Sequence, residues 1–346
     1  ETKMSEQTSA EQKKRKLSPL WILLLALVLA SAWLVGDMLH FIRTPASSEP
    51  TEVVVEVPVG MSLPSLSELL HEQGLVRSAE KFRWLVKFKG AARQIKAGEY
   101  QLSTGLRPGE LLNKITRGEV RLHQITFPEG YTLKQMAELL EASELVNAER
   151  FIAAATDPPF VHSLGIPATS LEGYLFPDTY RFAKGLPVET VLRSFVTMFN
   201  QHFGPVQEAQ ARKLGFTRHQ VVILASVVEK ETAVAEERPL IAGVFLNRLR
   251  KRIRLQSDPT VIYGLRNFDG NLTRAHLQKD TPYNTYTRRG LPIGPICNPG
   301  AASIQAVLNP TSTSYLYFVA KKDGTHHFST SLAEHNAAVS RHQKRH

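Results

Sequence analysis

The residues most capable of acid–base chemistry end an apolar stretch in the second half of the chain. Glu229 and Glu231 stand in "ILASVVEKETA", residues 223–233, with Lys230 between them. Burying an unpaired carboxylate is costly, and such a group usually keeps its proton. A carboxylic acid that stays protonated near neutral pH can act as a general acid. The alternative is that both glutamates form exposed ion pairs with Lys230 or Arg238, which contribute little.

A helix through residues 221–237 would place these glutamates on a buried element. Its apolar side chains cover most of the circumference, which is typical of a central helix. Glu229 and Glu231 lie two positions apart and point to nearly opposite sides, so they are not expected to face one cleft together. Because both sides are similarly apolar, the helical pattern alone does not choose between the two acids.

Two further stretches carry polar groups that could position a substrate. "RLQSDPTVIYG" (254–264) contains Asp258 before Pro259, which suits either a helix start or a functional role. "TPYNTYTRRGLPIGPICNPGA" (281–301) is long and rich in proline and glycine, and ordered loops of this length are often functional. Aromatic faces and amide side chains suit a sugar polymer, although the tyrosines could equally fix the loop to the core.

Composition limits the cofactors and partners that the chain can use. The 346 residues carry a net charge of +10, which fits an anionic partner or one local run of basic residues. A single cysteine, Cys297, excludes an internal disulfide. No phosphate loop, dinucleotide fingerprint or zinc spacing appears, so we expect no cofactor, no metal and no nucleic-acid partner. We interpret His326, His327 and His335 as packed or solvated residues.

The N-terminal region predicts a membrane anchor. Residues 19–36 contain no charged residue and are nearly long enough to span a bilayer. Trp21 and Trp33 lie near the two ends of this segment, where interfacial tryptophans are favoured. "ASA" at 30–32 leaves a cleaved signal peptide as the rival interpretation. We predict a cytoplasmic tail over 1–17, an anchor over 18–42 and a body outside the cytoplasm, because basic residues precede the apolar run.

Beyond the anchor the sequence predicts an α+β protein with two parts. Residues 43–120 are expected to hold a linker and a small βα module that resembles LysM-like domains, and 121–346 a helix-rich domain with a small β element. "PVGMSLPSLSELL" from Pro58 aligns with "PEGYTLKQMAELL" from Pro128, which indicates recurring strand–turn–helix units. Ser62 and Thr132 lie where a helix N-cap is expected, and Thr132 with Gln135 forms a capping-box pattern. "IKAGEYQLSTGLRPGELLNKI" repeats that theme more loosely. Later helices are predicted over 133–142, 188–203, 206–214, 218–236 and 240–251, with a hairpin from residue 314.

Several long strings resemble the endolytic murein transglycosylases of the YceG-like family. They are "ASVVEKETAVAEER" (225–238), "VFLNRLRKRIRLQSDPTVIYG" (244–264) and "YNTYTRRGLPIGPICNPG" (283–300), with support from "LEGYLFPDTY" (171–180), "YLYFVA" (315–320) and "KAGEY" (96–100). The resemblance runs from the N-terminal anchor to near the C-terminus. It implies a bacterial inner-membrane enzyme that cleaves the β-1,4 bond between N-acetylmuramic acid and N-acetylglucosamine inside nascent peptidoglycan, leaving 1,6-anhydro ends.

The resemblance maps the family's catalytic glutamate onto Glu229 and leaves Glu231 a structural role. One acid suffices because the sugar's own 6-hydroxyl replaces water as the nucleophile. Apolar surroundings are expected to keep the proton on Glu229 before the reaction. Peptidoglycan synthases, the penicillin-binding proteins, are implied as partners. Seven residues are predicted to position the glycan: Gln256, Asp258, Thr260, Tyr263, Asn284, Thr285 and Tyr286. The alternatives are a hydrolytic muramidase using Glu229 and Asp258, and a non-enzymatic wall-binding scaffold.

Overall fold

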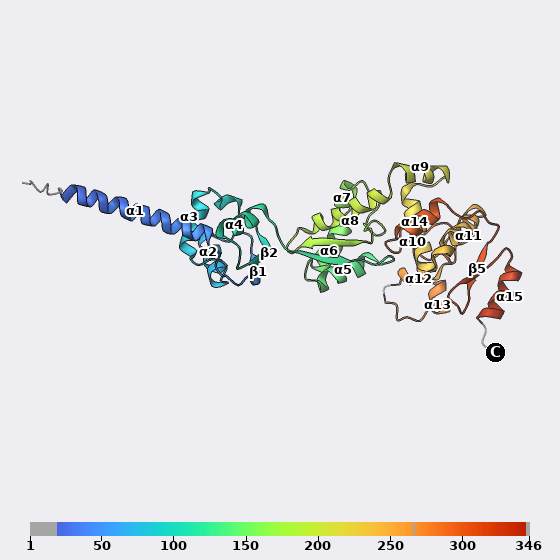
Figure 1. The fold of residues 1–346 in the computed structure, drawn as a ribbon. Coiled ribbons are helices and arrows are strands. Elements are labelled where there is room, and N and C mark those ends of the chain that lie inside the picture. Colours follow the sequence, from blue (N-terminus) through green and yellow to red (C-terminus); the bar gives the residue numbers. More distant parts are fainter. Residues whose placement is uncertain (1–18, 266, 344–346) are drawn as a thin grey trace, which may run out of the picture. The chain divides into compact units, whose positions relative to one another are not determined.

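The computed structural model describes residues 19–265 and 267–343 and divides into two compact units (Figure 1). The first unit ends at Arg121 and the second begins at Leu122, and each is described here by itself. The expected cytoplasmic tail, residues 1–17 with its basic cluster, lies outside the described residues. The α+β class predicted from the sequence is confirmed, because the described part of the chain combines long helices with three small two-stranded sheets.

A long apolar helix, α1 (Pro19–Arg43), leads into the first unit. Among the described residues it is the one helix long and apolar enough to cross a membrane, and its apolar side chains from Leu20 to Val35 are exposed. Its last turns belong to the first unit, because Phe41 is buried in that unit's core and Met38 and Ile42 pack against it. The helix is consistent with a membrane anchor.

The first unit is a βααβα module. Its two strands pair antiparallel, with Val55 opposite Tyr100. Ser62 and Ser78 cap the first two helices of the module by accepting hydrogen bonds from backbone N–H groups, as helix N-caps do. The elements are β1 (Glu52–Val57), α2 (Leu63–Glu72), α3 (Ala79–Phe88), β2 (Gly98–Ser103) and α4 (Pro108–Arg117), with a short 3₁₀ helix, η1 (Ala92–Gln94), before β2.

The segment expected to be a linker is fixed on the first unit. Two of its backbone N–H groups donate to Thr104: that of Ser47 to the Thr104 carbonyl at 3.1 Å, and that of Thr51 to the Thr104 hydroxyl at 3.0 Å. Arg77 also donates to the carbonyl of Ala46. Composition predicted a linker here, and these hydrogen bonds show that it joins α1 to the module without a free spacer.

The second unit opens with the same βααβα module. Its strands pair with Ile125 opposite Tyr180, just as Val55 faces Tyr100 in the first copy. Both tyrosine hydroxyls donate to the carbonyl four residues earlier, at 2.8 Å for Tyr100 and 2.7 Å for Tyr180. The elements are β3 (Leu122–Thr126), α5 (Leu133–Ala142), α6 (Ala148–Ala155), β4 (Thr179–Ala183) and α8 (Val188–His202).

This duplication explains the aligned phrases in the sequence. The match at Pro58 and Pro128 covers the turn after the first strand and the first helix of each copy. The predicted cap at Thr132, with Gln135 as its capping-box partner, is confirmed. "IKAGEYQLSTGLRPGELLNKI" is not a third, looser unit. It forms β2 and α4, the closing half of the first copy, whose counterpart is β4 and α8.

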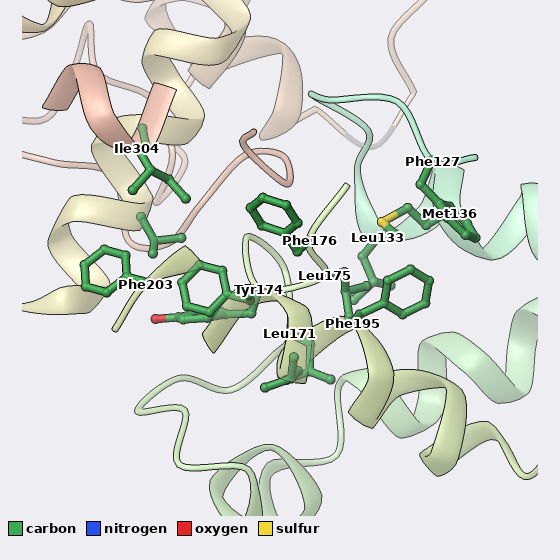
Figure 2. Packing of buried hydrophobic residues seen from close by; sticks show 14 of the residues in the cluster. Phe127, Leu133, Met136, Leu171, Tyr174, Leu175, Phe176, Phe195, Phe203 and Ile304 are labelled. Carbon is green, nitrogen blue, oxygen red and sulfur yellow. The ribbon is translucent and has the colours of Figure 1, made fainter. Parts of the chain in front are cut away.

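The two copies differ in the connection between the second helix and the second strand. In the second copy this connection is longer and includes α7 (Pro158–Ser163) followed by residues 164–178. Leu171, Tyr174 and Leu175 of this connection lie in the middle of the unit's apolar cluster (Figure 2). The insertion thus packs the copied module into the rest of the second unit, since one cluster joins it to later helices.

A buried helix lies at the centre of the remaining chain. In α10 (Arg218–Glu231) every residue from Val221 to Val228 is buried, as the sequence predicted, and α11 and α14 pack against it. The helix ends at Glu231 and not at residue 236, because Thr232 is extended and η2 follows. The other elements are α9 (Pro205–Lys213), η2 (Ala235–Glu237), α11 (Arg238–Arg250), α12 (Asp258–Tyr263), α13 (Arg274–Gln278), α14 (Ala301–Leu308), β5 (Tyr317–Ala320), β6 (His326–Ser329) and α15 (Leu332–His342). The predicted C-terminal hairpin is confirmed as β5 paired with β6.

Candidate functional site

Glu229 occupies the last turn of α10, where the helix emerges from the core. Its side chain is 6% exposed, and its carboxylate has two partners. The backbone N–H of Gly300 donates to Oε2 at 3.0 Å, and Nη2 of Arg238 lies 3.7 Å from Oε1. The apolar surroundings expected at this position are therefore found around the preceding turns of α10. The carboxylate of Glu229 itself contacts a peptide N–H and a guanidinium.

A second carboxylate lies beside the first one. Glu129 comes from the turn between β3 and α5, and its Oε2 lies 3.8 Å from the same Nη2 of Arg238. Burial raises the pKa of Glu129, the neighbouring Glu229 raises it further, and Arg238 opposes both effects. Sequence reasoning missed Glu129, although the aligned repeats contain the signal: the first copy has Val59 where the second has Glu129.

The loop before α14 fixes the position of Gly300. Asn298 holds this loop against two other segments: it exchanges backbone hydrogen bonds with Gly130 and Tyr131 at 2.9 and 2.8 Å, and its side-chain Oδ1 accepts the N–H of Gly173 at 2.8 Å. A Cβ atom on Gly300 would overlap the carboxylate of Glu129. A side chain at position 300 would therefore require Glu129 to move away from the place where the backbone passes between the two acids.

An open cavity of about 400 Å³ lies in front of the paired acids, within the size range of small-molecule sites. It is polar and contains both signs of charge, so it suits a hydroxyl-rich ligand better than an apolar one. Its lining residues are Glu129, Glu229, Lys230, Glu231, Thr232, Ala233 and Arg238.

Glu231 has different partners from Glu229, as the helical geometry predicted. It accepts a hydrogen bond from the Ser257 hydroxyl, and burial raises its pKa to about 7; Asp258 raises it as well, whereas Ser257 and Arg248 lower it. The residue nevertheless lines two cavities, the one in front of Glu229 and a larger one of about 480 Å³. The expectation that the two acids share no cleft therefore holds for their hydrogen-bond partners but not for the surface that they line.

Three of the residues predicted to position glycan meet in the larger cavity. Gln256, Asp258 and Tyr286 line it together with residues of β5, β6 and α15. The Tyr286 hydroxyl donates to Asp258 Oδ1 at 2.5 Å. Gln256 has a φ of 53°, a strained conformation for a residue with a side chain, and such strain is often found at functional sites.

Of the other four predicted glycan-binding residues, three are buried and Tyr263 is partly buried. Thr260 and Thr285 are buried and hydrogen-bonded to each other at 2.8 Å, and the buried Asn284 donates to the carbonyls of Leu277 and Lys279. Tyr263 donates to a buried carboxylate. A glycan on the surface cannot reach Thr260, Asn284 or Thr285, so the direct contact expected from their polar character is corrected: they fix the loop that carries Tyr286.

The carboxylate that accepts the hydrogen bond from Tyr263 belongs to Glu172, which sequence reasoning did not select. Glu172 is 5% exposed and accepts hydrogen bonds from Tyr263 at 2.8 Å, the Leu133 N–H at 3.0 Å and Asn298 Nδ2 at 3.2 Å. Burial raises its pKa to about 7 against the opposing effect of hydrogen bonds from Tyr263 and from the backbone of Leu133 and Gly173. Glu172 thus joins the start of α5, α12 and the Gly300 loop from inside the core.

Two adjacent carboxyl groups, one guanidinium and an open polar cavity define an acid–base site of the kind that glycan-cleaving enzymes use. The chain belongs to the YceG-like family, whose model matches residues 55–341. It is 33% identical over 328 residues to a Bacillus subtilis protein named endolytic murein transglycosylase, covering 90% of each chain. A Streptococcus pneumoniae protein of the same name is 30% identical over 322 residues, 84% of this chain and 58% of that protein.

A solved structure supports the same family. The crystal structure of a putative YceG-like protein from Listeria monocytogenes is 33% identical to this chain. The likeness has a TM-score of 0.58 and covers 84% of this chain and all of the Listeria chain.

Proposed function

We propose that this chain is an endolytic murein transglycosylase that cleaves the bond between N-acetylmuramic acid and N-acetylglucosamine within nascent peptidoglycan strands and terminates their elongation. The observation that carries the proposal is the position of Glu229: it ends a buried helix, is held by Gly300 and Arg238, and lines an open polar cavity. The names of the relatives give the substrate class.

Glu229 would act as the only proton carrier. It donates its proton to the glycosidic oxygen while the bond to C1 of the muramic acid breaks and positive charge develops at C1. The resulting carboxylate takes the proton from the 6-hydroxyl of the same sugar, and O6 bonds to C1. No water is consumed, and the product ends in 1,6-anhydro-N-acetylmuramic acid.

The partners of Glu229 fit the second half of this cycle. The Gly300 N–H and Arg238 contact the carboxylate oxygens, and a carboxylate is the state of Glu229 after the first proton transfer. Glu129, on the same guanidinium, adds a second carboxyl group whose pKa is raised by burial and by Glu229.

The second cavity gives a long glycan a place to extend. Glu231 lines both cavities, so the polar surface continues from Glu229 towards Gln256, Asp258 and Tyr286. An enzyme that cuts inside a strand must hold sugars on both sides of the broken bond. We therefore keep these three residues as the proposed glycan contacts.

The remaining assignments concern location. The βααβ order and antiparallel pairing of residues 52–103 support a LysM-like module that binds peptidoglycan. We propose that α1 anchors the protein in the bacterial inner membrane, with the N-terminus cytoplasmic and both units outside. Peptidoglycan synthases would then work on the same strands.

Mass spectrometry of the glycan ends tests the proposed reaction. The full chain should be used in detergent, because truncation at Arg43 would remove Phe41 from the core of the first unit. Anhydro ends on every new muramic acid are expected. Reducing ends one water heavier would show a muramidase instead, with Glu129 as a second carboxylate better placed than Asp258, which contacts Tyr286 and lines the other cavity. Intact strands would leave only a wall-binding scaffold.

A further inference from the structure

An apolar hollow lies between α1 and α3 within the first unit. It has a volume of about 570 Å³ and is formed by the end of the long helix and one side of α3. Its most exposed aromatic residues are Trp84, at 50%, and Phe88, at 78%, and their rings lie 6.0 Å apart. The lining residues are Leu34, Val35, Asp37, Met38, Leu39, Glu80, Lys81, Trp84 and Phe88.

The two helices are held together at this hollow. Lys81 Nζ of α3 lies 2.7 Å from Asp37 of α1, and Phe41 continues α1 into the core of the module. Because no free spacer separates α1 from the module, a bilayer crossed by α1 would meet α3 at a defined depth.

That depth follows from the length of the helix. About 20 residues at about 1.5 Å each cross the hydrocarbon core, so a span that begins at Leu20 ends near Leu39. Residues 34–39, which line the hollow, then lie at the far edge of the bilayer. Trp84 and Phe88 line the same hollow and so lie at the level where aromatic side chains are favoured.

Charge on the same helix fits a lipid surface. Lys87 lies over the Trp84 ring, with Nζ 5.5 Å from its centroid. Arg83 and Lys89 add positive charge on α3 or directly after it, whereas the charge of Lys81 is paired with Asp37. Basic residues next to exposed aromatic residues attract anionic headgroups while the rings enter the interfacial layer.

We propose that the aromatic face of α3, defined by Trp84 and Phe88, lies in the headgroup layer of the bilayer that α1 crosses and binds anionic lipid there. The proposal rests on the proposed membrane anchor. Its consequence is that the first unit sits directly on the membrane surface at a fixed height.

Tryptophan quenching tests this contact in the full chain. With Trp21→Phe and Trp33→Phe, Trp84 is the sole tryptophan, since the chain contains three. In nanodiscs that contain anionic lipid, lipids brominated near the headgroup should quench Trp84 strongly, and aqueous iodide only weakly. A matched control adds Val54→Trp and Trp84→Phe, which moves the probe to exposed strand β1. In this control the tryptophan at position 54 should be quenched strongly by iodide and only weakly by the brominated lipids.

The outcomes separate the possible occupants of the face. Quenching of Trp84 by iodide but not by brominated lipid would overturn the proposal. Trp84 could instead be protected from both iodide and brominated lipid, to a degree that depends on the density of the protein in the bilayer. That result would assign the face to a contact with a second copy and would also overturn the proposal. Cleavage of purified glycan by the Trp84→Ala/Phe88→Ala chain reports on the proposed enzyme separately, because neither residue belongs to the second unit.

Discussion

The two copies of the βααβα module share a backbone but have different surroundings at the same turn. In the first copy Val59 is 92% exposed, and Gly60 has open space where a Cβ would lie. In the second copy the corresponding residues are Glu129, beside Glu229, and Gly130, whose missing Cβ would lie 3.5 Å from Glu229 Cγ. The fold of the turn is therefore not what makes it part of a site. A carboxylate and a neighbouring helix end make the difference.

The insertion in the second copy supplies the rest of that difference. Glu172, which lies in the insertion, accepts the N–H of Leu133 at the start of α5. It also contacts Asn298 of the loop that places Gly300. In the first copy the helix start is capped by Ser62 alone, with the Ser65 hydroxyl 2.8 Å away on an exposed surface. The first module is thus complete by itself, whereas the second is joined to the site.

Among changes that leave Glu229 itself in place, the largest effect should follow from filling the space between the two acids. In Gly300→Ala the methyl group would occupy the position of the Glu129 carboxylate, so this carboxylate must move away from Arg238 and Glu229. We expect kcat to fall by about 100-fold, since small displacements of catalytic groups have effects of that size. Gly60→Ala is the control in the first-copy turn that corresponds to Glu129 and Gly130: its φ of 82° strains a side chain, but no neighbour lies within 4 Å, so kcat should be unchanged. Equal losses in both variants would contradict the account.

A smaller effect is expected when Glu129 loses its charge. In Glu129→Gln the ion pair of Glu129 with Arg238 is lost, whereas the pairing of Arg238 with Glu229 remains. The pH–rate profile should lose the ionisation of Glu129, whose pKa is raised by burial and by Glu229, and kcat/KM should fall by about tenfold in the pH range where that ionisation acts. Val59→Gln is the matched control. A uniform loss at every pH would indicate a purely structural role for Glu129.

Stability should depend on pH through Glu172, which has no counterpart in the first copy. Burial raises its pKa from 4.5 to about 7, so the folded protein binds more protons than the unfolded chain between these values. Its contribution to stability should therefore fall by about 3 kcal/mol as pH rises from about 4.5 to 7, and stay constant above that. In Glu172→Gln the free energy of unfolding, measured with denaturant, should decrease less steeply as pH rises. The pH dependence that remains should include the contribution of Glu231. An unchanged slope would contradict the assignment.

The smallest effect tests the equivalence of the two copies. Tyr100→Phe and Tyr180→Phe each remove a hydroxyl that donates to the carbonyl four residues earlier. Each should lower the free energy of unfolding of its own unit by about 1 kcal/mol, measured by denaturant unfolding followed by hydrogen exchange. If only one variant is destabilised, the duplicated hydrogen bond does not have the same role in both copies.

Local patterns in the sequence predicted much of the fold. The buried run of α10, the caps at Ser62 and Thr132 and the C-terminal hairpin each depend on neighbouring residues, so periodicity and cap chemistry were enough. The fixed segment after α1 was missed, because its partners at Thr104 and Arg77 lie far along the chain.

The site was harder to predict for the same reason. The residue pattern offered both Glu229 and Glu231, and only the resemblance to the YceG-like family selected Glu229; Glu129 and Gly300 reach the site from segments about 100 and 70 residues away. Thr260 and Asn284 looked like ligand contacts because polar type alone does not reveal burial. Such long-range neighbours become visible only when the tertiary structure is known.

The rate of glycan cleavage by Glu229→Gln tests the central claim most directly, with the full chain and purified peptidoglycan strands as substrate. The amide keeps the size of the side chain and can still accept the Gly300 N–H, but it has no proton to give. We expect a fall of about 1,000-fold in cleavage rate with little change in glycan binding, and no fall for Glu138→Gln on the exposed surface of α5. A Glu229→Gln chain that still cleaves within tenfold of the unchanged protein would contradict the account.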